Sequence, residues 1–204
     1  MEQTSTKRKL IFQIIMVVFI GLILVSTVFA WFVTGSKSHN VIFTTGNLDV
    51  EATLYQANDP DFDGVFDESD YEEKTSDILI ENAMSNQIYS FKLVIKNHST
   101  VAGNLTVTLK DILFLNESAT TDTTFSEAFD LKHTILDSDD YTSVQTPFPT
   151  TDYIIATKSD FDFANGNNEV VLKFQIVVNK NLTNSHFGYT FSISTIEVKL
   201  EQTS

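Results

Sequence analysis

At least five stretches of this chain alternate between apolar and polar residues with a period of two, and they constrain the fold more than any other feature. Successive side chains of a β-strand point to opposite faces, so such a stretch predicts a strand with one buried face. The strongest run has apolar residues at every second position: Val170, Leu172, Phe174, Ile176 and Val178. Similar runs cover residues 48–54, 89–95, 105–109 and 189–200.

The last of these runs changes phase, because its apolar residues up to Ile193 and from Ile196 onward have opposite parity. We expect a β-bulge near Ser194 or Thr195, where one extra residue would return the apolar side chains to the buried face. Several half-buried strands need a second layer to cover them. The pattern therefore predicts an all-β fold, a two-layer antiparallel sandwich.

The polar segments between these runs are expected to be loops: residues 56–86, 116–124, 137–152 and 164–168. A short helix is expected over residues 124–129, with Thr124 as its cap and Glu127 three positions later. The 204 residues suit one folded domain, and we find no internal repeat. The chain has no cysteine, which excludes disulfides, thiol catalysis and zinc sites built from cysteine.

The amino terminus has the pattern of a secretory signal. Three basic residues, Lys7 to Lys9, precede an uncharged stretch that continues to Ser36. A helix over residues 10–30 would be roughly 31 Å long, enough to cross a bilayer core of about 30 Å. We therefore predict a signal peptide over residues 1–30 and a β-sandwich domain over residues 31–204, outside the cell.

Small residues favour cleavage of this signal. Val28 and Ala30 stand at the two positions that a signal peptidase reads, which makes Trp31 the first residue of the mature protein. The alternative is a retained membrane anchor, because the stretch is also long enough to span a bilayer.

The formal net charge of the chain is -14 at pH 7. A surface of this sign repels nucleic acid and anionic lipid and attracts cations, so nucleic acid is not an expected partner.

One acidic stretch has the spacing of a calcium loop. Alternating oxygen ligands wrap a large cation, and Gly64 would permit the sharp turn between them. The alternative is a solvated acidic loop. The candidate Ca²⁺ ligands are Asp59, Asp61, Asp63, Asp67 and Asp70.

The junction between the signal and the domain resembles a known family. Residues 30–33 read Ala-Trp-Phe-Val, and residues 43–50 read Phe-Thr-Thr-Gly-Asn-Leu-Asp-Val. This arrangement resembles the TasA and camelysin (CalY) family of secreted bacterial proteins, whose signal peptides are read by a SipW-type signal peptidase. Residues 89–109, with the turn Asn97 to Thr100, and residues 188–200 are similar to the family more loosely. Residues 56–86 and 116–152 match nothing in it.

The resemblance implies a sandwich of jelly-roll type and, for the best-known members, extracellular fibres of the biofilm matrix. It also implies assembly similar to donor-strand exchange, with the subunit itself or other matrix proteins as partners. Trp31, Phe32 and Val33 would then be the donated segment. The alternative is that residues 31–43 fold back onto their own domain.

Three functions follow from these observations. The leading one is a secreted structural protein of the cell surface or biofilm matrix. The second is an extracellular binding module held at the membrane by an uncleaved signal. The third is a metalloprotease of the camelysin type, which the sequence disfavours because its four histidines are scattered and form no His-Glu-x-x-His pair. We therefore expect no enzyme and assign no catalytic residue.

Overall fold

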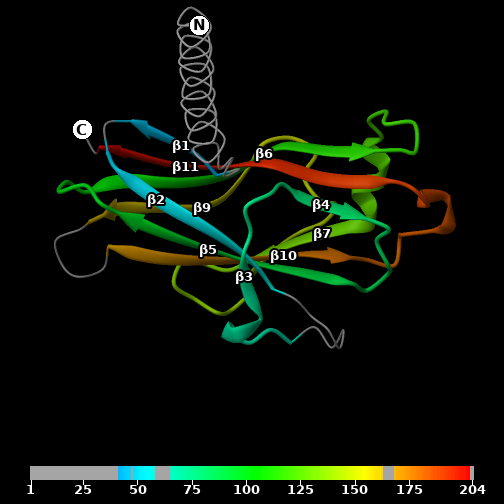
Figure 1. Ribbon diagram of the computed structural model, residues 1–204, viewed down its shortest axis with the longest axis horizontal. Helices are drawn as coiled ribbons and strands as arrows, with labels where there is room; N and C mark the ends of the chain where they lie inside the picture. Colours follow the sequence, from blue (N-terminus) through cyan, green and yellow to red (C-terminus); the bar gives the residue numbers. More distant parts are fainter. Residues whose placement is uncertain (1–40, 47, 58–64, 163–167, 203–204) are drawn as a thin grey trace, which may run out of the picture. The chain divides into compact units, whose positions relative to one another are not determined.

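The computed structural model describes residues 41–46, 48–57, 65–162 and 168–202 (Figure 1). The predicted signal, residues 1–30, lies outside them. The elements, in chain order, are β1 (Val41–Gly46), β2 (Val50–Ala57), η1 (Glu68–Asp70), β3 (Tyr71–Glu73), β4 (Ile78–Glu81), β5 (Ile88–Asn97), β6 (Gly103–Leu115), η2 (Thr123–Ala128), β7 (Phe129–His133), β8 (Ser143–Gln145), β9 (Tyr153–Phe161), β10 (Glu169–Val178), η3 (Asn184–His186) and β11 (Thr190–Gln202).

Two sheets form the two layers, which confirms the all-β sandwich predicted from the alternating runs. Among the described residues, a five-stranded sheet has the order β1-β11-β6-β9, with β4 also pairing with β11, and a six-stranded sheet has the order β3-β2-β5-β10-β7-β8. Every pair is antiparallel except β1 with β11, which run parallel. Figure 1 shows β1 alongside β11, while β2 continues in the other sheet.

The phase change in β11 has a different origin from the predicted bulge. The pairing of β11 with β6 keeps one register from Thr190–Leu115 to Gln202–Gly103, so the prediction of an extra residue in β11 was wrong. Both strands reverse their buried face at the same level, where Asp111 of β6 has a φ of 52°. The Thr195 hydroxyl donates to the Asp111 carboxylate at 2.8 Å across this point.

The core is rich in phenylalanine. Five buried rings from both sheets and the connections between them form a cluster, in which Phe191 of β11 contacts three of the others. Its ring centroid is 4.8 Å from that of Phe114, 5.0 Å from Phe129 and 4.9 Å from Phe148. Phe125 of η2 packs edge-on against Phe129 at 4.9 Å. The expected short helix at this position is thus confirmed as a 3-10 helix, capped by Asp122 rather than Thr124.

A polar side chain fixes the connection between β5 and β6. Asn97 is fully buried, and its side-chain amide donates to the Phe161 carbonyl at 2.9 Å. Its side-chain oxygen accepts the Ser99 backbone N–H at 2.9 Å, which closes an Asx-type turn.

Two of the expected loops contain strands. Residues 56–86 include the short strands β3 and β4, and residues 137–152 include β8. None of the helices in the described segments is long and apolar enough to span a membrane.

Replacement of Phe191 by Ala is expected to lower the free energy of unfolding by about 3 to 5 kcal/mol, because the cavity would lie between three other rings. Urea unfolding followed by circular dichroism measures this change. Phe187→Ala is the matched control, since that side chain is 76% exposed. An equal effect of the two substitutions would contradict the packing described.

Candidate functional site

Two lysines lie next to each other on the outward face of the six-stranded sheet. Lys92 of β5 and Lys173 of β10 are direct cross-strand partners. Their side chains are only 14% and 18% exposed. Like charges placed directly opposite each other destabilise a sheet, so this lysine pair requires nearby negative charge.

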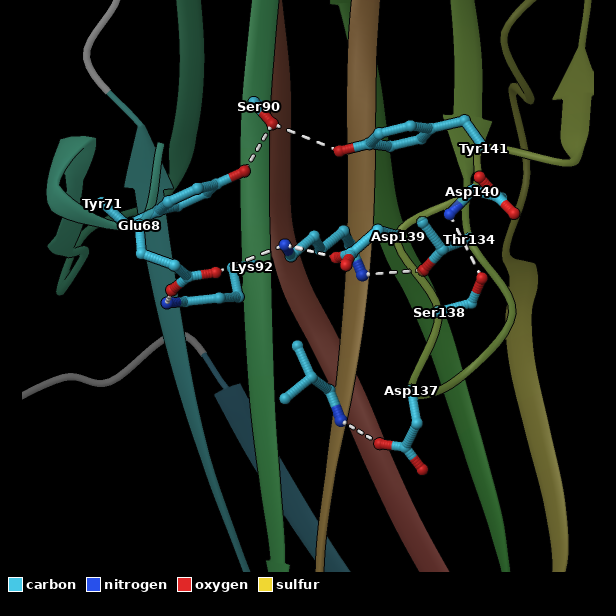
Figure 2. Close-up of polar contacts among 12 residues, drawn as sticks. Glu68, Tyr71, Ser90, Lys92, Thr134, Asp137, Ser138, Asp139, Asp140 and Tyr141 are labelled. Atoms are coloured by element: carbon cyan, nitrogen blue, oxygen red, sulfur yellow. Dashed lines mark hydrogen bonds and ion pairs between the residues drawn. The ribbon is translucent and has the colours of Figure 1, made fainter. Parts of the chain in front are cut away.

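Two connections supply that charge. Glu68 of η1, between β2 and β3, pairs with Lys92 at 2.5 Å and with Lys173 at 3.3 Å. Asp139, in the connection from β7 to β8, pairs with Lys173 at 2.7 Å. Figure 2 shows Glu68 and Asp139 reaching over the sheet from opposite sides. The lysine pair thus holds both connections against the sheet.

Hydroxyl groups continue this cluster. The Tyr71 hydroxyl lies 2.9 Å from the Ser90 hydroxyl, which lies 3.5 Å from the hydroxyl of Tyr141 (Figure 2). Ser90 points outward from β5 yet is fully buried, because the two connections cover it. Burial raises the pKa of Tyr71, so its phenol stays protonated at neutral pH. A hollow of about 400 Å³ lies beside these residues.

The electrostatics of the cluster favour a structural role over catalysis. The hydrogen bond from Lys92 lowers the pKa of Glu68, and the hydrogen bond from Lys173 lowers the pKa of Asp139. The contact with Asp139 in turn raises the pKa of Lys173. Each of these groups is therefore held in its charged form at neutral pH, whereas a general base or a lysine nucleophile needs a pKa near the working pH.

The predicted calcium ligands divide into two sets. Asp59, Asp61 and Asp63 lie outside the described residues. Asp67 directly precedes η1 and Asp70 is its last residue, and the Asp70 carboxylate accepts the Asp67 backbone N–H at 2.6 Å. Asp70 thus closes a turn of its own backbone. Among the described residues no group of three or more acidic or histidine side chains is arranged to hold a metal ion.

The predicted cleavage and donor residues, Val28, Ala30 and Trp31 to Val33, also lie outside the described part of the chain. The first described strand after them is β1, whose pairing with β11 is the parallel one.

The described histidines lie apart from one another. His98 contacts Glu51 at 2.9 Å, His133 lies 3.2 Å from the Thr134 carbonyl, and His186 belongs to η3.

Sequence reasoning missed the lysine pair. The alternating runs over residues 89–95 and 170–178 put both lysines on outward faces, but nothing in the sequence gives the register of β5 against β10.

No protein-family model matches the chain, and no curated protein or solved structure matches it.

Replacing Glu68 by Gln is expected to lower the free energy of unfolding at pH 7 by less than about 1 kcal/mol, because the Glu68 side chain is 68% exposed and solvent screens its ion pairs. Because the pKa of Glu68 is lower in the folded protein, its ion pairs contribute their full stabilisation above pH 4.5, the ordinary pKa of the group. This contribution is lost as the pH falls through the lower pKa of the folded protein. The difference between wild type and variant should therefore shrink below pH 4.5.

Urea unfolding at several pH values measures this difference. Glu72→Gln is the matched control, because Glu72 is exposed and forms no ion pair among the described residues. A difference for Glu68→Gln that stays constant through acid would contradict the ion-pair interpretation.

The calcium site stays a prediction, which calorimetry tests. Titration of Ca²⁺ into the wild-type protein is expected to give a heat of binding that is lost in the Asp61→Asn, Asp63→Asn double variant. The Glu72→Gln protein should bind as the wild type does. No heat with the wild type would remove the site.

Proposed function

We propose that the chain is a secreted, TasA-like structural protein of the cell surface or biofilm matrix. Its subunits assemble by exchanging an amino-terminal strand at the edge of the five-stranded sheet. The observation that carries this proposal is the position of β1, an added parallel strand on an otherwise antiparallel framework.

The framework without β1 supports a jelly roll, the finer fold that we propose. A jelly roll wraps eight strands into two sheets. The eight strands from β4 to β11 give the orders β4-β11-β6-β9 and β5-β10-β7-β8. β11, the last of these eight strands, thus lies between β4 and β6, and β10, the seventh, lies between β5 and β7. β1 is outside this set and is not needed to complete it.

The edge that β1 covers is suited to strand addition. On the side of β11 away from β6, β4 pairs with Thr190–Ile193 and β1 pairs with Ile196–Glu201. The six β1 pairs follow one register without a bulge. Without β1, this half of β11 would present unpaired backbone groups, which an extended segment of another chain can bind.

The other described sheet edges are less suited to this role. β3 and β8, at the edges of the six-stranded sheet, have only three residues each. β9 is longer, but its pairing with β6 is interrupted at two places, and it carries Lys158. Bulges, short strands and edge lysines all discourage pairing with another chain.

Leu48 provides a fixed point behind the exchanging strand. It is buried in the core directly before β2, so the chain is anchored where it leaves the five-stranded sheet. Gly103 makes room for it, because a Cβ at that position would lie 2.6 Å from Leu48 Cδ1. An exchange that moves β1 can therefore leave β2 and the rest of the core in place.

Export follows from the signal expected over residues 1–30, cleaved before Trp31 by a SipW-type peptidase. Trp31, Phe32 and Val33 then belong to the segment that is exchanged together with β1. Amino-terminal sequencing of the exported protein tests this step, and Met1 as its first residue would contradict cleavage.

Single-cysteine variants test the exchange directly, because the natural chain contains no cysteine. Thr44 of β1 and Lys199 of β11 are Cα partners. When Thr44→Cys and Lys199→Cys proteins are mixed and oxidised, we expect a disulfide-linked dimer of the two different chains, which mass spectrometry identifies. Because neither protein contains both cysteines, this cross-link joins two subunits, and exchange places the two thiols next to each other.

The control pair is Thr106→Cys of β6 with Thr157→Cys of β9, which are also partners but do not exchange in the proposal. Mixing these two should give no cross-link between the different chains. A double Thr44→Cys, Lys199→Cys variant that closes only within one chain, with no cross-link in the mixture, would show that β1 stays on its own subunit and would overturn the proposal.

A further inference from the structure

One end of the sandwich carries a pocket of about 570 Å³, which we name the end pocket. Its walls come from two connections, residues 82–85 between β4 and β5 and residues 182–189 between β10 and β11. Phe125 of η2 also lines it. The volume falls in the range of sites that bind small ligands.

Aromatic rings form much of the end pocket. Phe125 is buried, and the His186 ring lies 5.2 Å from it, centroid to centroid. Tyr189 packs edge-on against Phe125 at 5.1 Å. Phe187 also lines the pocket but leaves 76% of its surface exposed. A large apolar ring on a loop, held next to a packed aromatic group, is available to stack on a ligand.

Unused hydrogen-bonding groups lie beside these rings. The Nδ1 atom of His186 accepts the Thr183 backbone N–H at 3.2 Å, so in the neutral imidazole Nε2 carries the proton and can donate. The side-chain amides of Asn82 and Asn184 have no hydrogen-bond partner among the described residues. Each amide offers both donors and an acceptor.

The lining of the end pocket differs in charge from the chain as a whole, whose net charge is -14. None of its lining residues is an aspartate, glutamate, lysine or arginine. An anionic ligand would therefore find no counter-charge in this lining, and it would meet the carboxylates of Asp122, 3.4 Å from the Tyr189 hydroxyl, and of Glu117, next to Gly188. A purely apolar ligand would leave the amides of Asn82 and Asn184 unpaired, which costs free energy when they are covered.

We propose that the end pocket binds a neutral oligosaccharide. A sugar ring combines an apolar face, which stacks on an aromatic side chain, with hydroxyls that donate to and accept from amides and imidazole. Phe187 is the stacking residue, and Asn82, Asn184 and His186 bind the hydroxyls. This binding activity is separate from strand exchange, because the end pocket involves neither β1 nor the edge of β11 that β1 covers.

Saturation-transfer NMR on the full-length protein, in a detergent without a sugar headgroup, tests the proposal. The probes are chitotetraose, cellotetraose and maltotetraose, each at concentrations up to about 10 mM. We expect saturation transfer to at least one of them. Phe187→Ala should weaken its binding about tenfold, and Asn184→Ala should weaken it as well.

Ile154→Ala is the matched control, because Ile154 is 56% exposed on β9 and does not line the end pocket. It should bind the sugar as the wild type does. The proposal is overturned if none of the three sugars receives saturation, or if Phe187→Ala binds like the wild type. Binding of N-acetyl-leucinamide in place of the sugars, lost in Phe187→Ala, would assign the pocket to peptide side chains and overturn it equally.

Discussion

Apolar contact between the inward faces of the two sheets is the interaction on which the rest of the structure depends. Buried side chains such as Leu172 and Val198 sit on strands whose outward positions carry the charged and polar groups. Once the pairing of those strands is fixed, it also determines which outward side chains are neighbours. The register that makes Lys92 and Lys173 partners also stacks Phe91 on Phe174 in the core, with ring centroids 4.9 Å apart. Glu68 and Asp139 then compensate for that proximity.

The sequence predicted the long strands because each buries several side chains at alternate positions. It failed at β7 and β9 for physical reasons. β7 has only five residues and buries just Phe129 and Leu131 on its inward side, so no period is visible. In β9, Ile154 is exposed and Ile155 buried, and the pairing with β6 is irregular, which removes the alternation. Pairing register is also absent from sequence, so the lysine pair and the end pocket were not predicted.

The sequence pattern of β11 correctly indicated that the buried face reverses, but the predicted cause, a bulge in β11, was wrong. A bulge in one strand would shift its register against β6. Instead both strands turn their buried faces together at Asp111, which keeps every backbone pair on either side. The consequence lies on the opposite edge of β11, where β4 ends its pairing at Ile193 and β1 begins at Ile196. The reversal therefore divides this edge into a part that belongs to the framework and a part that an added strand covers.

The strand exchange that we propose at this edge would replace one set of β1–β11 pairs by an identical set, so those backbone hydrogen bonds would favour neither monomer nor polymer. The short connection at Leu48 favours the monomer. It holds β1 near the β11 edge of its own subunit at an effective concentration of about millimolar. The exported subunits also repel one another, because cleavage after Ala30 removes three basic residues and one acidic residue and makes the net charge of -14 still more negative. Polymerisation therefore needs contacts that only the exchanged state makes, or a high local concentration at the cell surface. In our proposal these contacts come from Trp31, Phe32 and Val33, because burial of such apolar side chains between subunits would favour association.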